Sequence, residues 1–354
     1  MMRRLVGLDV ARGLAVVLMI QTHAYDAWVV PSERASSWFG FTRLLGTLPL
    51  PLFLCIAGLN VGQRVVRMAE LGRPNGQLQR ELLQQAGRVL AAGYGLNVLY
   101  ACLDGYTGLA TFLRIDVLHC IGLSVALLAA CLGGGPTIRP RAFATRCFAG
   151  GAFVLLACPT LTRLAQPAAG SAWHYLLAPW LELRGTHSMP VIPLFFFAAS
   201  LAALGANLSP SRLVDGRALA AGAGLALPLV ALGLAGEAWL AAHGMAPSRT
   251  NPGIWFNALG LLGRAGWVLG LTLLLARRRV RDVPVLSLLG RHSLLLYGLH
   301  LPLCYGRLAG ALKRSSSLAT ASLWLLGLVV LCWLVAWLRE GHARTASPAL
   351  SLGS

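Results

Sequence analysis

Charged side chains are scarce in this sequence of 354 residues. Lys, Arg, Asp and Glu together make up 12% of it, whereas they make up about 25% of an ordinary soluble protein. Hydrophobic residues reach 56%, and the mean hydropathy is +0.67. This balance excludes a soluble globular enzyme and a disordered chain. A membrane helix takes about 20 apolar residues, so the apolar share is enough for about ten such helices.

Several motifs with known chemistry are absent as well. None of the eight cysteines stands in a CxxC pair or in a Cys/His zinc spacing, so the sequence indicates neither a disulfide scaffold nor a zinc site. There is also no HExxH, no Gly-x-Ser-x-Gly elbow and no P-loop. We therefore expect no metal, and the chemistry has to come from other residues.

Hydropathy predicts an all-α integral membrane protein with about ten transmembrane helices. We expect a single membrane domain over residues 1–340 and a short cytoplasmic tail over 341–354, without an internal repeat. The connection 162–188 is rich in aromatic residues, which is typical of an interfacial segment. The predicted spans are 8–30, 44–63, 82–103, 112–132, 147–161, 189–208, 218–240, 256–276, 284–306 and 319–338.

The positive charges predict the orientation. The net charge is +18, and Lys313 is the only lysine among 30 cations. In a soluble protein this excess would suggest nucleic acid, but here the cations stand in short connections between apolar runs, so we expect lipid and no nucleic acid around the chain. With the N-terminus inside, eighteen cations fall on the inner side and eight on the outer side. This bias predicts that both termini are cytoplasmic.

Ionisable residues inside apolar spans are costly and usually functional. On the first helix, Asp9 and Arg12 are three residues apart and can form a structural pair. His23 follows eleven residues after Arg12, about 16 Å further along a helix, and Asp26 comes three residues later. On position alone, His23 is equally well explained as a packing histidine.

Two later spans carry further ionisable groups. In 112–132, Asp116 and His119 are three residues apart, so the carboxylate could orient the imidazole. The alternative is an ion network that only fixes helix packing. In 284–306, Arg291 and His292 stand near the inner end. His300 lies eight residues after His292, on nearly the same face and toward the outer half.

Several stretches resemble a known family. Arg12, ten intervening residues and then His23 resemble the signature of integral-membrane acyltransferases that act on glycans. More closely, the chain resembles the heparan-α-glucosaminide N-acetyltransferase-like family of multi-span proteins, and the matching stretches occur in family order. They are 8–15, 51–58, 117–122 and 289–300, with a weaker one at 189–195.

The resemblance implies an enzyme that moves an acetyl or other acyl group from cytosolic acyl-CoA to an outer acceptor. The acceptor would be an amino sugar or sugar hydroxyl on a glycan or lipid-linked sugar. His23 would be the base or a transient acyl carrier. The other expected catalytic or acceptor-side residues are Asp26, Asp116, His119 and His300.

The donor would need cationic partners near the inner side. Arginine pairs suit phosphate, and coenzyme A carries several phosphates. Any inner helix end is rich in arginine, however, so these residues are equally consistent with orientation signals. The expected acyl-CoA-binding residues are Arg12, Arg64, Arg67, Arg291 and His292.

The chain departs from the family at one point. The lysosomal members carry Asn at the position of His23 and a proposed catalytic His about eleven residues later, where this chain has Arg34. The resemblance also implies a homodimer, and we expect a bacterial inner membrane. The main alternative is a proton-coupled secondary transporter that uses buried His, Asp and Arg, and a scaffold with purely structural charges is a third. N- or O-transfer, and direct or acyl-enzyme transfer, stay open.

Overall fold

The structure, a computed structural model, describes most of the chain as helix. The described residues are 6–104, 112–164, 177, 180–181, 189–208, 215–245, 251, 253–279 and 284–346. Within them, the only β-type pairings are two isolated bridges, Val29 with Ser316 and Pro74 with Thr137. The chain divides into two compact units, unit 1 with Met1–Pro49 and Leu275–Ser354, and unit 2 with Leu50–Leu274.

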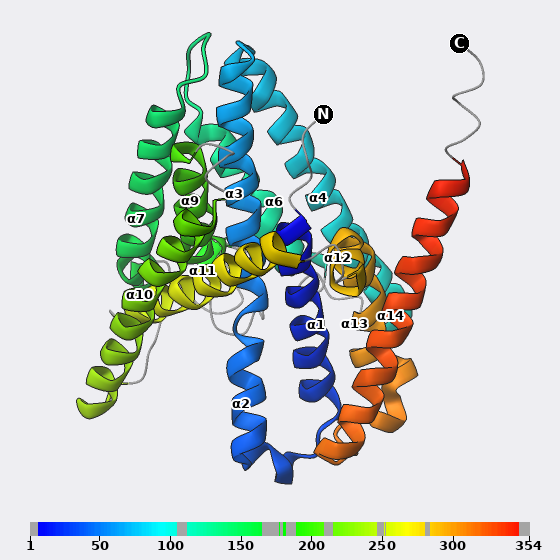
Figure 1. The fold of residues 1–354 in the computed structure, drawn as a ribbon. Helices are drawn as coiled ribbons and strands as arrows, with labels where there is room; N and C mark the ends of the chain where they lie inside the picture. Colours follow the sequence, from blue (N-terminus) through cyan, green and yellow to red (C-terminus); the bar gives the residue numbers. More distant parts are fainter. Residues whose placement is uncertain are drawn as a thin grey trace. The chain divides into compact units, whose positions relative to one another are not determined.

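Unit 1 joins the two ends of the chain. Helix α1 packs against α12, α13 and α14, and α2 also lies against α1 (Figure 1). Its elements are α1 (Val6–Trp28), η1 (Pro31–Ala35), α2 (Ser37–Gly46), α12 (Pro284–Arg291), α13 (Ser293–Tyr305), η4 (Arg307–Leu312) and α14 (Leu318–Ala346).

Glycine brings α1 and α12 into backbone contact. A Cβ atom at Gly290 would overlap the carbonyl oxygen of Asp9, and one at Gly13 would overlap the carbonyl oxygen of Leu286. Small residues at facing positions let membrane helices approach this closely. The spacing and register of α1 and α12 are therefore set by main chain rather than by large side chains.

Helix α14 is held to unit 1 near both of its ends. At its start, the Leu318 amide donates to Oε2 of Glu33 at 2.6 Å, and Ser316 just before it pairs with Val29. Near its other end, Glu340 accepts from Nη1 of Arg291 at 3.0 Å. Most of its surface is otherwise uncovered, with Leu323 71% exposed, as expected for a helix that faces lipid.

Unit 2 contains the middle of the chain. Helix α7 packs on α9, and α4 packs on α6 (Figure 1). The α3–α4 turn and the α6–α7 loop lie side by side, and the Asn75 amide at this point donates to the Pro136 carbonyl at 3.0 Å. The elements are α3 (Pro49–Glu70), α4 (Asn75–Asp104), α6 (Val117–Cys131), α7 (Pro140–Leu164), α9 (Val191–Asn207), α10 (Gly216–Ala242) and α11 (Gly253–Arg279), whose last turn belongs to unit 1.

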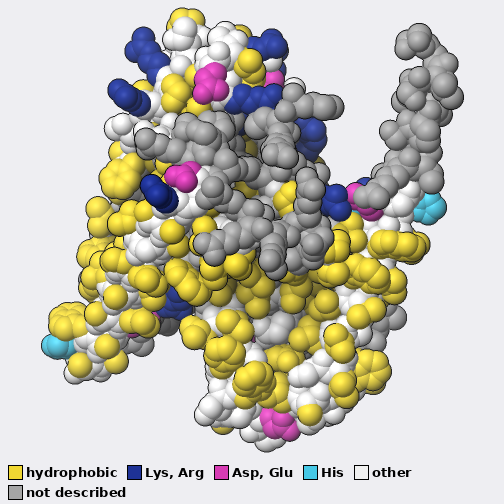
Figure 2. Space-filling model, viewed as in Figure 1, with side chains coloured by type: hydrophobic (Ala, Val, Ile, Leu, Met, Phe, Trp, Pro, Cys, Tyr) yellow, Lys and Arg dark blue, Asp and Glu magenta, His cyan; other side chains and the backbone are white. Residues whose placement is uncertain are grey.

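The prediction of a helical membrane protein is confirmed. Six helical segments in the described residues are long and apolar enough to cross a membrane, and α6, α9 and α13 are shorter apolar helices. Hydrophobic side chains cover much of the face drawn in Figure 2. The six segments are Val6–Trp28, Ser37–Glu70, Pro140–Leu164, Gly216–Ala242, Gly253–Leu275 and Leu318–His342.

Some predicted boundaries differ from the observed ones. The span 284–306 is two helices, because the chain leaves helical geometry at His292 (φ −101°, ψ 16°). The span 112–132 becomes an α-helix only at Val117, and Asp116 is its N-cap. Helix α14 continues through Ala346 into the predicted tail. Most of the connection 162–188 and residues 347–354 lie outside the described residues.

The glycine contact predicts a sharp difference between two substitutions. Gly290→Ala should lower the free energy of unfolding by about 1–3 kcal/mol, because the new methyl group meets backbone that cannot yield cheaply. Gly327→Ala on α14 is the matched control, since nothing lies within 4 Å of its added Cβ. Thermal unfolding in detergent measures both. Equal melting temperatures for the two variants would contradict the backbone contact.

Candidate functional site

Two histidines that are 277 residues apart meet in unit 1. Nδ1 of His23, on α1, lies 2.9 Å from Nε2 of His300, on α13. The ring planes differ by 5° and the centroids are 5.1 Å apart. The centroid distance exceeds the N···N distance by about one ring width, so the rings lie edge to edge in nearly one plane. His300 is fully buried, and His23 is partly exposed.

The hydrogen bonds fix the tautomers of a neutral pair. Nδ1 of His300 lies 2.7 Å from the carbonyl oxygen of Leu296, and a carbonyl can only accept. His300 therefore carries its hydrogen on Nδ1, and its Nε2 accepts from the Nδ1–H of His23. The remaining nitrogen of His23, Nε2, is then the one without a proton. In this tautomer, Nε2 of His23 has a lone pair that can accept a hydrogen bond or a proton.

Asp26 is connected to this pair through a tyrosine. The ring of Tyr305 meets His23 edge-on with centroids 5.6 Å apart, and its hydroxyl donates to Oδ2 of Asp26 at 3.2 Å. Arg34 donates to the Asp26 carbonyl at 2.6 Å and to the Val29 carbonyl at 3.1 Å. Arg34 thus satisfies carbonyls at the end of α1. Asp26 and Arg34 hold the surroundings of His23 in place.

A pocket of about 340 Å³ opens beside His23. Its walls come from the C-terminal part of α1, from α2 with the residue after it, and from the end of α13, all within unit 1. This volume is at the small end of the range for ligand sites. The lining residues are Gln21, Thr22, His23, Tyr25, Asp26, Phe39, Thr42, Arg43, Gly46, Thr47 and Tyr305.

Asp116 and His119 form a separate cluster in unit 2. The Asp116 amide donates to Nδ1 of His119 at 3.2 Å, while the Asp116 carboxylate pairs with Arg114 at 3.2 Å. The backbone of Asp116, rather than its carboxylate, therefore orients the imidazole. His119 is fully buried against Gly93 and Tyr94. Its Nε2 has no hydrogen-bond partner among the described residues.

Carboxylates hold the expected inner-end cations of unit 1. Nη1 of Arg12 donates to Oδ1 of Asp9 at 2.9 Å, the pairing expected from their spacing. Arg291 and His292 both meet Glu340, at 3.0 and 3.2 Å. These two residues stand at the break between α12 and α13. Their contacts fix the break to α14, and a phosphate ligand would have to compete with Glu340.

Arg64 and Arg67, at the end of α3, differ in their surroundings. Arg64 donates to Glu81, whereas Arg67 is exposed. A hydrogen bond from Gln77, followed by the contact with Arg64, lowers the pKa of the Glu81 carboxyl. Glu81 is therefore a carboxylate at neutral pH and balances the charge of Arg64. Arg67 is the better placed of the two arginines for an incoming anion.

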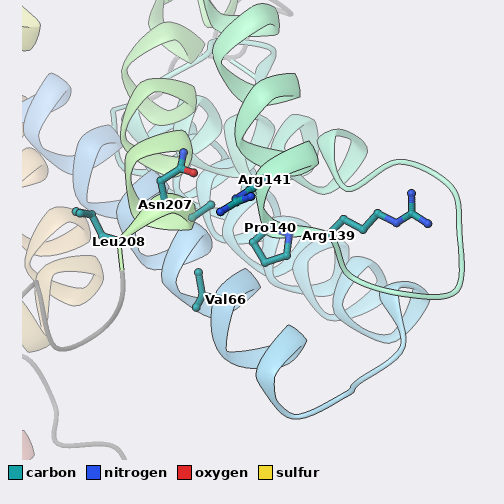
Figure 3. A pocket seen from close by; sticks show the side chains of 7 residues that line it. Val66, Arg139, Pro140, Arg141, Asn207 and Leu208 are labelled. Atoms are coloured by element: carbon teal, nitrogen blue, oxygen red, sulfur yellow. The ribbon is translucent and has the colours of Figure 1, made fainter.

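A second pocket, of about 460 Å³, lies beside this end of α3 within unit 2. Basic side chains gather at this end, around the α3–α4 turn and the start of α7 (Figure 2). In Figure 3, Arg139 extends away from the other labelled side chains, so Arg141 is the better placed guanidinium. The lining residues are Val66, Arg139, Pro140, Arg141, Ala206, Asn207 and Leu208.

Sequence reasoning missed this second pocket. Arg139 and Arg141 are two of the eighteen cations that were counted on the predicted inner side, and no sequence pattern assigns them another role. Their position just before a predicted inner helix start was a signal, but α9 residues such as Asn207 complete the pocket, and no sequence pattern links them to α7. Among the described residues, no group of three His, Cys, Asp or Glu side chains is arranged to hold a metal.

A comparison with protein families decides the class. The model described as heparan-alpha-glucosaminide N-acetyltransferase, catalytic, matches residues 4–233, more than half of the chain. The chain belongs to this family. A search of curated proteins finds no match.

Membership makes the chain a membrane acetyltransferase of the heparan-alpha-glucosaminide N-acetyltransferase type. The family match covers His23, Arg64, Asp116 and His119. It ends before His300, so the pairing of His300 with His23 comes from the structure alone. Within this acetyltransferase, His23 lies inside the matched region and His300 lies outside it.

The tautomer of His23 gives a direct test of the pair. In protein labelled with ¹⁵N-histidine, we expect His23 to show a protonated Nδ1 and an unprotonated Nε2 when neutral. In His300→Leu the acceptor is lost, and the His23 signals should shift toward the Nε2–H form that free imidazole side chains prefer. His342→Leu, at the exposed end of α14, should leave them unchanged. An Nε2–H form in the wild type would exclude the proposed order of hydrogen bonds.

Proposed function

We propose that this acetyltransferase moves an acetyl group from cytosolic acetyl-CoA to an amino sugar or sugar hydroxyl on the outer side of the membrane. The observation that carries the proposal is the hydrogen-bonded pair of His23 and His300 beside a pocket of about 340 Å³. The family match supports acetyl transfer. The pair supplies the base that an attacking hydroxyl or amine needs.

Each catalytic step uses a named atom. The acceptor oxygen or nitrogen attacks the thioester carbonyl carbon while His23 Nε2 takes its proton. The C–S bond then breaks, and the coenzyme A sulfur leaves and takes that proton back from His23. Through both steps, the Nδ1–H of His23 stays bonded to His300, which holds the ring orientation and stabilises the imidazolium. A covalent acyl-histidine route would use the same nitrogen.

The donor would bind through its phosphates at cationic inner ends. Arg67 and the pocket beside Arg141 support this, since exposed guanidinium groups offer several donors to phosphate. Arg64, Arg12, Arg291 and His292 are further candidates, each already held by a carboxylate. Coenzyme A is too highly charged to cross a bilayer, whereas an acetyl group is small and neutral.

The orientation and the number of spans complete the proposal. We infer that both termini are cytoplasmic, that about ten helices cross the membrane and that the membrane is a bacterial inner membrane. The excess of cations in the predicted inner segments supports this orientation. The acceptor would then be a glycan or lipid-linked sugar outside the cytoplasm. His119 and Asp116 would support acceptor binding, and a homodimer is the proposed assembly.

A proton-coupled transporter fits the histidine pair less well. In a relay, each member passes its proton to the next group. Here the hydrogen bonds from His23 through His300 lead to the carbonyl oxygen of Leu296, which does not take up a proton near neutral pH. A carbonyl at this position suits a fixed base and stops a relay in this direction.

Turnover by purified protein in detergent tests the role of His23. With acetyl-CoA as donor and glucosamine as acceptor, His23→Ala should lower kcat by about 10²–10⁴, with the KM for acetyl-CoA nearly unchanged. The wild-type rate should fall as the pH is lowered, because protonated imidazole cannot take a proton. Retained turnover in His23→Ala would exclude His23 as the base. A wild type without any affinity for coenzyme A would exclude the acyltransferase function.

Donor binding is tested by charge removal at the basic end of unit 2. Arg67→Ala with Arg141→Ala should raise the KM for acetyl-CoA about tenfold or more, since each charged hydrogen bond contributes about 1.5–3 kcal/mol, while kcat changes little. Arg88→Ala is the matched control, an exposed arginine on α4 outside the pocket. An equal effect in Arg88→Ala would mean that only the overall positive charge matters.

A further inference from the structure

The wall of the pocket beside His23 offers a surplus of hydrogen-bond acceptors. Thr22, Thr42 and Thr47 each donate their hydroxyl hydrogen to a carbonyl three or four residues earlier, at 2.7, 2.8 and 2.7 Å. A hydroxyl has one hydrogen to donate. These side chains therefore offer only lone pairs to a ligand.

Other groups in the wall add to this surplus of acceptors. Asp26 is a carboxylate whose side chain is 50% exposed, and the tautomer of His23 leaves Nε2 without a proton. Arg43 is the one cation among the lining residues. A ligand that fits the pocket must therefore supply O–H or N–H donors. A thioester acetyl group has none, so the pocket suits the acceptor rather than the acyl end of the donor.

Gln21 is the least expected residue in this wall. It lies within α1 and is 8% exposed. Its Oε1 is buried and has no hydrogen-bond partner among the described residues. A leucine would fill nearly the same volume without the cost of an unsatisfied amide. A buried carboxamide oxygen without a partner among the described residues indicates a partner that arrives with a ligand.

We propose that Gln21 binds the acceptor and determines its specificity. A carboxamide both donates and accepts, which matches a sugar hydroxyl, itself both donor and acceptor. Gln21 and the threonine oxygens together would select a ring that carries several hydroxyls next to the attacking group. Rotation of the terminal amide brings either of its ends to the ligand. This inference rests on the proposed function and deepens it, since it names the residue that recognises the acceptor.

Kinetics of Gln21→Leu separate acceptor binding from donor binding. With glucosamine and acetyl-CoA, the KM for glucosamine should rise about tenfold, the usual loss for one or two hydrogen bonds. The KM for acetyl-CoA should change less than about twofold. Gln84→Leu, an exposed glutamine on α4, is the matched control and should change none of these values.

A stability measurement separates a binding role from a structural one. If Gln21 has no protein partner, Gln21→Leu should melt at the wild-type temperature or above it. Glucosamine should raise the melting temperature of the wild type and of Gln84→Leu, but not that of Gln21→Leu. A Gln21→Leu protein that fails to fold, an unchanged KM for glucosamine or an equal rise in both KM values would each overturn the proposal.

The two proposals can fail independently. A wild type that does not turn over acetyl-CoA would overturn the acetyltransferase mechanism. A glucosamine-induced rise in melting temperature that is lost only in Gln21→Leu would still support the role of Gln21. Conversely, equal acetylation of glucosamine by the wild type and by Gln21→Leu would support the acetyltransferase function. It would exclude a role of Gln21 in acceptor recognition.

Discussion

The backbone contact between α1 and α12 sets the position of both histidines. Because Gly13 and Gly290 lack side chains, the two helices touch main chain to main chain, and no rotamer change can alter their distance. Two residues after Gly290, the chain leaves helical geometry at His292 and restarts as α13. The new direction of α13 carries His300 to within 2.9 Å of His23. The hydrogen bond between the two histidine rings thus depends on Gly13 of α1 and Gly290 of α12, neither of which touches the rings.

A neutral partner for the histidine pair suits its surroundings. In many acid–base sites a carboxylate orients the imidazole, and a buried carboxylate requires compensation for its lost hydration. Here the carbonyl of Leu296 orients the imidazole of His300 instead. It belongs to the same helix as His300, so its position follows from helix geometry alone. The pair therefore needs no buried negative charge in an apolar unit.

The sequence allowed the prediction of helices and of contacts along a helix, but not of contacts between helices. Asp9 and Arg12 pair because three residues make nearly one helical turn, and this spacing can be read directly from the sequence. Nothing in the sequence pairs His23 with His300, because 277 residues and several helices separate them. The break at His292 could not be predicted either, because local hydropathy runs through it without interruption.

The ties on α14 have a consequence for the depth of the site. Leu318 is held by Glu33 at one end, and Glu340 holds the α12–α13 break at the other. At 1.5 Å per residue, these points are about 33 Å apart along the helix, close to the roughly 30 Å of a bilayer's hydrocarbon core. A helix about as long as a bilayer core is thick is therefore tied to the rest of unit 1 near both of its ends. A thinner or thicker bilayer would have to adapt to this helix by bending its lipids, and His23 would keep its distance from either surface.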